Sequence, residues 1–115
     1  DETRHLLGTE EFRLMKKKPV IINTSRGGVI DEVALLEALN SGRIHSAGID
    51  VFENEPLTGR QSELVRHPRI ICTGHYAWYS DKASVELQRR AAMNLLNLLQ
   101  GNQVEDCLNL QSFGY

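Results

Sequence analysis

The sequence predicts an α/β fold built on a parallel sheet. Three short runs rich in β-branched residues, at positions 20–24, 47–51 and 70–73, are largely apolar along their length instead of alternating with polar residues. Such runs are typical of strands buried on both faces of a parallel sheet. Helical patterns separate the runs, and the crossover of a β-α-β unit is almost always right-handed. A chain of 115 residues is long enough for one small domain with one core.

The first element is predicted to be a short helix that begins at Thr9. The Thr9 hydroxyl can cap free N–H groups, and Glu10 and Glu11 suit the positive end of the helix dipole. Residues 16–18 are lysines, which suit the negative end, and Pro19 stops the turn before the first strand. The lysine triplet is therefore interpreted as a solvated helix end and not as a phosphate site.

A second helix is expected between the first two strands. Asp31 is its predicted cap, and Gly42 is its predicted end. The side chains expected to face inward are Val33, Leu35, Leu36 and Leu39. A short helical turn over residues 62–67 is expected to lead into the third strand.

The longest predicted element is a helix over residues 81–100. Leu87, Ala91, Leu95 and Leu98 recur at helical spacing, and Gly101 supplies the stop. This pattern predicts an amphipathic helix that docks against another surface.

Composition excludes several functional classes. The net charge is −2 with both signs interspersed, which gives no electrostatic footprint for nucleic acid. No apolar stretch is long enough to cross a bilayer, so a cytoplasmic protein is the default expectation. Two cysteines, Cys72 and Cys107, are too few and too far apart to predict a disulfide framework or a metal site.

Three charged side chains follow the predicted strands. Arg26, Glu55 and His75 each lie one to four residues beyond such a run. Loops at the carboxyl ends of parallel strands converge at one edge of the sheet, where ligands bind in open α/β folds. A guanidinium can hold a carboxylate through two hydrogen bonds, and an imidazole paired with a carboxylate can exchange a proton near neutral pH. The three residues therefore suit chemistry on a small carboxylic acid.

The residues around these three positions form motifs that occur in the expected order. They are NTSRGG at 23–28, AGIDVFENEP at 47–56 and ICTGH at 71–75. Nearly the whole chain resembles the D-isomer-specific 2-hydroxyacid dehydrogenase family, in the second half of its Rossmann-like nicotinamide-dinucleotide domain. The resemblance implies an enzyme that transfers a hydride between NAD or NADP and a 2-keto or D-2-hydroxy acid.

The resemblance also implies a role for each catalytic residue. Arg26 would bind the substrate through its carboxylate and carbonyl oxygens, and the Gly27-Gly28 turn would let the backbone approach the ligand closely. His75 would protonate the carbonyl oxygen while hydride arrives, and Glu55 would hydrogen-bond to His75 and fix its tautomer. Glu53 is interpreted instead as a solvated loop acid, and His5, His45 and His67 as ordinary exposed or packed residues.

Further positions would complete the pocket by resemblance. Thr24, Ser25 and Ala77 would bind the cofactor together with Arg26 and His75. Asp50 would face the nicotinamide carboxamide, or would simply accept backbone N–H bonds at the end of its strand. Trp78 would contact the substrate or pack against another domain. Gly74 departs from the proline that the family usually has there, which loosens the backbone just before His75.

The sequence has no G-x-G-x-x-G motif. Residues 1–115 are therefore expected to be the C-terminal part of the nucleotide-binding domain, without the phosphate-binding half or the substrate domain. The isolated chain is expected to be inactive, and the intact protein is expected to be a homodimer by resemblance. An alternative is a corepressor-like protein that senses NAD(H), because residues 77–80 also resemble that branch of the family.

Overall fold

Three parallel strands form the centre of the first of two units in the computed structural model, which describes residues 2–57, 63–104 and 107. The first unit comprises residues 1–77 and the second comprises residues 78–115. In chain order, the elements of the first unit are α1 (Thr9–Leu14), β1 (Val20–Asn23), the 3-10 turn η1 (Gly27–Val29), α2 (Glu32–Asn40), β2 (Ser46–Ile49), α3 (Glu63–Arg66) and β3 (Ile70–Cys72). The second unit contains α4 (Asp81–Leu99).

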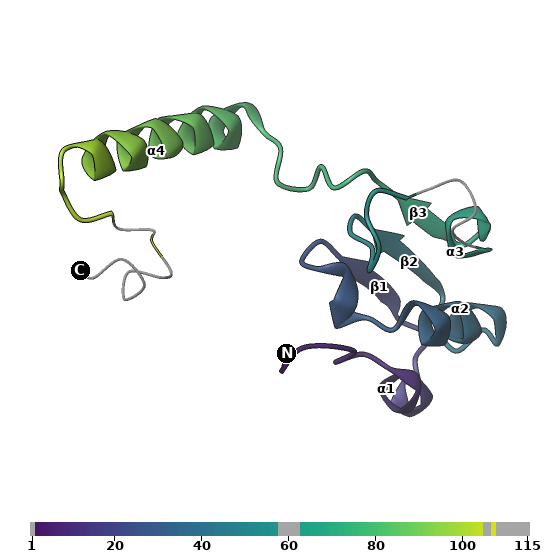
Figure 1. The fold of residues 1–115 in the computed structure, drawn as a ribbon. Coiled ribbons are helices and arrows are strands. Elements are labelled where there is room, and N and C mark those ends of the chain that lie inside the picture. Colours follow the sequence, from purple (N-terminus) through teal and green to yellow (C-terminus); the bar gives the residue numbers. More distant parts are fainter. Residues whose placement is uncertain (1, 58–62, 105–106, 108–115) are drawn as a thin grey trace. The chain divides into compact units, whose positions relative to one another are not determined.

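The strands lie in the order β1-β2-β3, and both neighbouring pairs are parallel (Figure 1). Ile21 is opposite Ala47, and Ile49 is opposite Cys72. The helix α2 connects β1 to β2, and α3 lies between β2 and β3. This topology confirms the α/β prediction, and all three strands end at the same edge.

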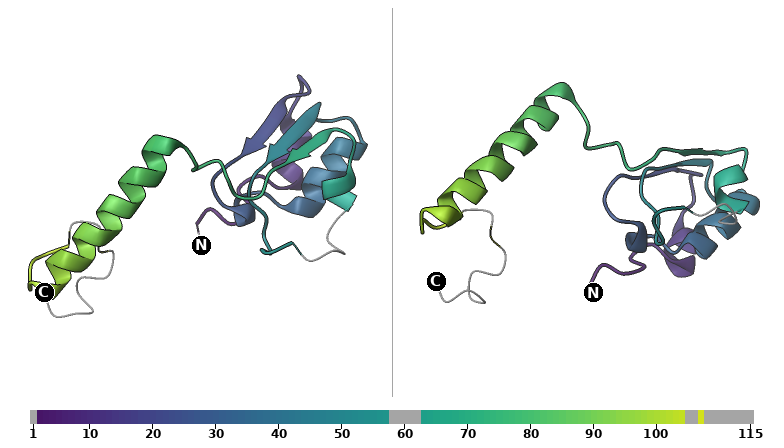
Figure 2. Two further views of the ribbon diagram at one scale, coloured as in Figure 1. Left: turned by 90° about the horizontal axis from the view of Figure 1, so that it is seen from above. Right: turned by 45° about the horizontal axis from the view of Figure 1, so that its top comes forward.

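One face of the sheet carries the hydrophobic core. Figure 2 shows α1 and α2 on the same side of the three strands. Alternate strand residues point toward these helices and are buried there. The core residues are Phe12, Ile21, Ile30, Ala34, Leu35, Ala38, Leu39, Ile44, Ala47, Ile49, Phe52 and Leu64.

The opposite face of the sheet is exposed, so the prediction of strands buried on both faces was wrong for this chain. Ile22 is 72% exposed and Ile71 is 74% exposed, and Val20 is also exposed. Side chains alternate between the two faces of a strand. The described helices of the first unit pack on the face of Ile21 and Ile49 alone.

Helix α2 begins as predicted, and of the four residues predicted to face inward only Val33 does not. Both Val33 N and Ala34 N donate hydrogen bonds to Asp31 Oδ1, at 2.9 and 3.1 Å, which confirms the cap. The buried positions are Ala34, Leu35, Ala38 and Leu39, whereas Val33 is exposed. Position 34 thus faces inward in place of position 33, and Leu36 is partly buried beside the core.

Helix α1 is shorter than predicted, and its N-cap lies one residue before the predicted cap. Gly8 is the N-cap, and its N–H donates to Glu11 Oε2 at 2.9 Å, so Thr9 lies inside the first turn. The helix ends at Leu14, and the three lysines therefore follow it instead of forming its last turn. Phe12 is the residue of α1 that reaches the core.

The long helix agrees with the prediction in its bounds. Ala83 N donates to the Ser80 hydroxyl oxygen at 3.1 Å at its start, and Gly101 adopts a φ of +73° just beyond its end. The residue Glu86 accepts hydrogen bonds from Arg89 and Arg90 along the helix surface. None of the residues of α4 is buried. Within the described part of the chain, no helix has both the length and the apolar character that crossing a membrane requires.

Candidate active site

The loops that follow β1, β2 and β3 carry the polar residues singled out from the sequence. Because the strands are parallel, Arg26, Asp50, Glu55 and His75 all lie beyond the carboxyl ends of the strands. This is the edge at which ligands bind in open α/β sheets.

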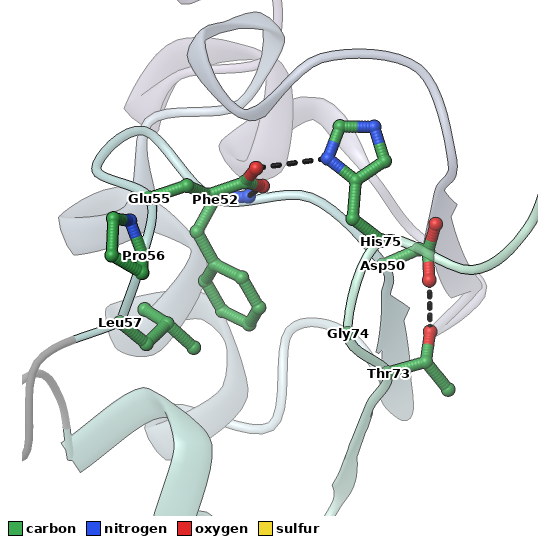
Figure 3. A pocket seen from close by; sticks show the side chains of 8 residues that line it. All are labelled: Asp50, Phe52, Glu55, Pro56, Leu57, Thr73, Gly74 and His75. Carbon is green, nitrogen blue, oxygen red and sulfur yellow. Dashed lines mark hydrogen bonds and ion pairs between the residues drawn. The ribbon is translucent and has the colours of Figure 1, made fainter.

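His75 and Glu55 form a hydrogen-bonded pair between the loops after β3 and β2 (Figure 3). The distance between His75 Nδ1 and Glu55 Oε2 is 2.8 Å, and about half of the His75 side chain is exposed. The backbone of His75 has a φ of +62°, and its N–H donates to the Asp50 carbonyl oxygen at 2.9 Å. A non-glycine residue in this left-handed region is held there by its surroundings. The pair leaves the Nε2 edge of the ring directed away from Glu55 (Figure 3).

The Glu55 carboxylate is fixed by two donors. Phe52 N donates to Glu55 Oε1 at 2.8 Å, and His75 occupies the other oxygen. The Phe52 N–H bond, followed by the His75 bond, lowers the pKa of Glu55 below its ordinary value. Glu55 therefore remains ionised at neutral pH and can accept the hydrogen bond that orients the imidazole.

Asp50 binds the loop that carries His75. The Asp50 carboxylate is buried, and its Oδ1 accepts hydrogen bonds from the Thr73 hydroxyl and from the Tyr76 N–H. Its Oδ2 accepts a hydrogen bond from the Ala77 N–H. The two bonds from backbone N–H groups are each 2.9 Å long. The Thr73 hydrogen bond is the largest cause that lowers the pKa of Asp50, and the two backbone bonds add to it. This is the strand-end role that the sequence left open for Asp50. Because an ionised carboxylate offers about four acceptor sites, Oδ2 retains one that none of these bonds uses.

A cavity of about 530 Å³ lies beside the His75–Glu55 pair. Its volume is within the range of small-molecule sites. It is lined by Asp50, Phe52, Glu55, Pro56, Leu57, Thr73, Gly74 and His75 (Figure 3). All of these residues belong to the loops after β2 and β3.

Arg26 lies at the same edge but outside this cavity. It lines a smaller hollow of about 220 Å³ with Thr3, Arg4, Gly28 and Val29, and its Nη1 donates to the Ser25 carbonyl oxygen at 2.8 Å. Because β2 lies between β1 and β3, the strand ends that carry Arg26 and His75 are about 10 Å apart. Among the described residues, no hydrogen bond or ion pair joins Arg26 to His75 or Glu55. The structure thus brings two of the three predicted residues into contact.

Two residues shape the loops of the site: Asn23, for which no role was predicted, and Gly27, which was predicted to let the backbone approach a ligand. Asn23 is buried. Its Oδ1 accepts hydrogen bonds from the Ser25 N–H at 3.1 Å and from the Ser25 hydroxyl at 2.8 Å. Its Nδ2 donates a hydrogen bond to the Arg26 carbonyl oxygen at 2.9 Å. A side chain on Gly27 would overlap the backbone of Phe52 and Glu53. Gly27 therefore permits close approach of one loop to another. The asparagine directly after an apolar run was the signal for the first feature, whereas the second depends on tertiary contact.

The remaining predicted site residues have varied surroundings. Thr24 is exposed, and the Ser25 hydroxyl is used by Asn23. A Cβ at Gly74 would lie 3.0 Å from the Tyr76 ring, so a larger residue there requires that ring to shift. Trp78 belongs to the second unit, where its ring packs edge-on against Tyr79.

The cysteines and histidines give no sign of a metal centre. Among the described residues, no group of three or more His, Cys, Asp or Glu side chains is arranged to hold a metal ion. Burial raises the pKa of the Cys72 thiol, which disfavours the reactive thiolate and agrees with a packing role.

Comparison with known proteins identifies relatives with this fold. Residues 1–77 match the family model of the D-isomer specific 2-hydroxyacid dehydrogenase, NAD binding domain. The chain is 42% identical over 109 residues to glyoxylate/hydroxypyruvate reductase B of Cronobacter sakazakii, covering 95% of this chain and 33% of that protein. The corresponding enzyme of Enterobacter sp. is 43% identical, with the same coverage.

Solved structures agree with the sequence relatives. A glyoxylate reductase from Paecilomyes thermophila superposes with a TM-score of 0.82 at 34% identity, covering 96% of this chain and 33% of that one. The D-lactate dehydrogenase of Escherichia coli superposes with a TM-score of 0.78 at 37% identity, covering 93% and 33%. The chain spans about a third of the length of these relatives. From the match over residues 1–77, we conclude that this chain belongs to the D-isomer specific 2-hydroxyacid dehydrogenase family and contains part of its NAD binding domain.

Proposed function

We propose that this chain supplies the proton-transfer pair of an NAD(P)-dependent reductase that acts on small 2-keto acids. The observation that carries the proposal is the 2.8 Å hydrogen bond between His75 Nδ1 and Glu55 Oε2 beside a cavity of about 530 Å³. A carboxylate-oriented imidazole at the edge of such a cavity is suited to general acid-base catalysis.

In the reductive direction, protonated His75 donates the proton on Nε2 to the carbonyl oxygen of the substrate. Glu55 holds Nδ1–H throughout and stabilises the imidazolium, because the Phe52 N–H keeps this carboxylate ionised. In the oxidative direction, neutral His75 accepts the hydroxyl proton at the same nitrogen. The imidazole thus serves both directions.

Arg26 is proposed to bind the substrate carboxylate. Its guanidinium has five N–H donors, of which the structure shows one bonded to the Ser25 carbonyl oxygen. Substrate binding requires the exposed guanidinium to turn from Ser25 toward the cavity. Exposed side chains make such rotamer changes rapidly. A substrate held this way has its carboxylate toward β1 and its carbonyl toward His75.

The residues present fit the nicotinamide end of NAD or NADP. Asp50 Oδ2 retains an acceptor site for a carboxamide N–H, and Thr24, Ser25 and Ala77 complete the proposed contacts along this edge. The dinucleotide would supply the hydride when bound. The phosphate-binding glycine motif does not occur in the sequence, so these residues would hold one end of the cofactor alone.

The wider assignments rest on family resemblance. We propose that residues 1–115 form the C-terminal part of a NAD(P)-binding domain, with residues 81–100 as a docking helix and Trp78 near the substrate. The intact protein would be a cytoplasmic homodimer. The relatives named above are reductases and a dehydrogenase, and no observation favours the corepressor alternative.

A chimera tests the proposal, because the chain alone is expected to be inactive. This chain replaces the aligned residues of the Cronobacter sakazakii reductase, and NADH oxidation is followed with glyoxylate. His75→Asn should lower kcat by about 100- to 10,000-fold. Arg26→Gln should act mainly by raising KM.

The matched control is His45→Asn. His45 is also exposed, but it lies at the amino end of β2, away from the proposed site. Retention of the original kcat by the His75→Asn chimera would contradict the proposal. Dinucleotide binding without turnover in the unmodified chimera would favour a regulatory role.

A further inference from the structure

A second histidine–carboxylate pair lies next to the loop that presents Glu55. His5 Nε2 hydrogen-bonds to Glu53 Oε1, and Arg4 Nη2 lies 3.4 Å from Glu53 Oε2. The other nitrogen of His5, Nδ1, lies 3.7 Å from Asp31 Oδ2. The side chain of Glu53 is only 20% exposed, so the prediction of a solvated loop acid was wrong. Tertiary contact across 48 residues places His5 there.

The segment that carries His5 is itself fixed to the first unit. His5 N donates to the Gly28 carbonyl at 2.7 Å, and Leu7 N donates to the Val29 carbonyl at 3.1 Å. The backbone of His5 has a φ of +51°, in the left-handed region that its neighbours must maintain. His5 is therefore firmly attached to the first unit.

Glu53 is also anchored through its backbone. Its N–H donates to Glu32 Oε1 at 2.7 Å, at the start of α2. Gly27 packs directly against the peptide that joins Phe52 to Glu53. The contacts on Glu53 thus come from the N-terminal segment, from η1 and from α2.

Glu53 lies inside the turn that determines where the Glu55 carboxylate points. Phe52 N, one residue before it, donates to Glu55 Oε1, two residues after it. We propose that Glu53, held by His5 and Arg4, is a positioning residue that fixes residues 52–55 so that Glu55 reaches His75. The catalytic meaning of this inference rests on the proposed function, but the geometric part does not.

The direction in which the pKa of Glu55 changes can distinguish a positioning role of Glu53 from the simple effect of its negative charge. Removal of the negative charge of Glu53 would by itself lower the pKa of Glu55, because a like charge disfavours ionisation. Loss of the positioned Phe52 and His75 hydrogen bonds would instead raise the pKa of Glu55. Two substitutions at one position can therefore distinguish the two effects.

The experiment is a carbon-13 NMR titration of the glutamate and aspartate carboxyls in this 115-residue chain. Glu53→Gln removes the charge but keeps an oxygen that His5 can donate to, whereas Glu53→Ala removes both. We expect the pKa of Glu55 to be higher in Glu53→Ala than in Glu53→Gln by about 0.5, the equivalent of one ordinary hydrogen bond. The pKa of the Asp50 carboxyl should not change, because its hydrogen-bond partners are Thr73, Tyr76 and Ala77.

Control variants complete the test. Glu10→Gln removes an exposed carboxylate that pairs with Arg13, and it should leave the pKa of Glu55 unchanged. His5→Ala should raise the pKa of Glu55, and His5→Gln should restore it in part by supplying a donor. This second pair keeps the test decisive if a Glu53 variant does not fold.

Equal pKa values of Glu55 in the Glu53→Ala and Glu53→Gln variants would overturn the proposal. Parallel changes in the pKa values of Asp50 and Glu55 would also overturn it, because they would indicate a general loosening of the structure. The measurement involves neither substrate nor cofactor. Failure here therefore leaves the proposed reductase activity untouched, and an inactive chimera leaves this inference untouched.

Discussion

The two units of the chain stabilise their helices in different ways. In the first unit, α2 has nine residues and packs Leu35 and Leu39 into the core. In the second unit, α4 has nineteen residues and no buried side chain. Short isolated helices are marginal in water, so α2 depends on its packing. The longer α4 is supported instead by its cap at Ser80 and by pairs of residues along its own surface.

The same residue type shows the contrast directly. Leu35 is 1% exposed in α2, whereas Leu98 is 53% exposed in α4. An amphipathic pattern thus predicts a helix correctly in both units, but it does not reveal whether the apolar side chains of that helix are buried. The proposed active-site loops belong to the packed unit, where contacts between distant residues hold them.

The largest effect should come from Gly27→Ala. The added Cβ would overlap backbone atoms of Phe52 and Glu53, which cannot move aside as a flexible side chain can. We expect a loss of at least about 3 kcal/mol in the free energy of unfolding of the first unit. Urea titrations followed by NMR should show the β1–β3 signals lost at a lower urea concentration than in the unsubstituted chain.

The neighbouring glycine provides the control for that substitution. A Cβ at Gly28 would lie 3.6 Å from the nearest atom, Arg4 Nη1, which is an ordinary contact. Gly28→Ala should therefore change stability by no more than about 1 kcal/mol. Equal losses in the two variants would contradict the close-approach explanation.

The next effect is expected from a pair of leucine truncations. Leu35→Ala should destabilise the first unit by about 3 kcal/mol, because it leaves a cavity in a packed core. Leu98→Ala should change the free energy of unfolding by less than about 0.5 kcal/mol, since its side chain is half exposed. Chemical denaturation of both variants measures the difference. A large loss in Leu98→Ala would show that α4 packs as the first unit does.

The smallest effect on the stability of the first unit is expected from a fall in pH. The pKa values of Asp50 and Glu55 are lowered in the folded state, so their contribution to stability is present above their ordinary values near 4 and is lost as pH falls through the lower folded values. The pKa of Glu86 in α4 is lowered to about 2 by Arg89 and Arg90. Signals of the first unit should therefore weaken as the pH falls below the ordinary carboxyl range near 4.

NMR spectra recorded during an acid titration test this order of events. Glu55→Gln should reduce the pH dependence of the first unit without changing that of α4. Simultaneous loss of both units as the pH falls would contradict the difference described here.

Local patterns were sufficient to predict much of the fold. The three strands, the Asp31 cap and the bounds of α4 follow from runs of β-branched residues, a capping side chain and helical spacing. The exposed face of the sheet was not predictable, because a strand of apolar residues has the same sequence whether one face or both are covered. The exposure of Val33 was missed for a related reason, since apolar spacing does not decide which neighbouring position of α2 packs on the core.

The site divides in the same way. Motif and spacing were enough to single out Glu55 and His75, and the hydrogen bond between them agrees with the interpretation of these residues as a pair. The catalytic and binding roles of Arg26, Asp50 and the other site residues stay predictions. The anchoring of Glu53 by His5 could not be inferred, because nothing in the local sequence of either residue indicates the other.

The sequence by itself determined the order of strands and helices and the residues that follow each strand, because these depend on local propensity, capping and the spacing of apolar side chains. Only the tertiary structure decided which face of the sheet is covered and how the Glu55 loop is held. These features arise from contacts between residues twenty to fifty positions apart, and such contacts exist only after the chain has folded.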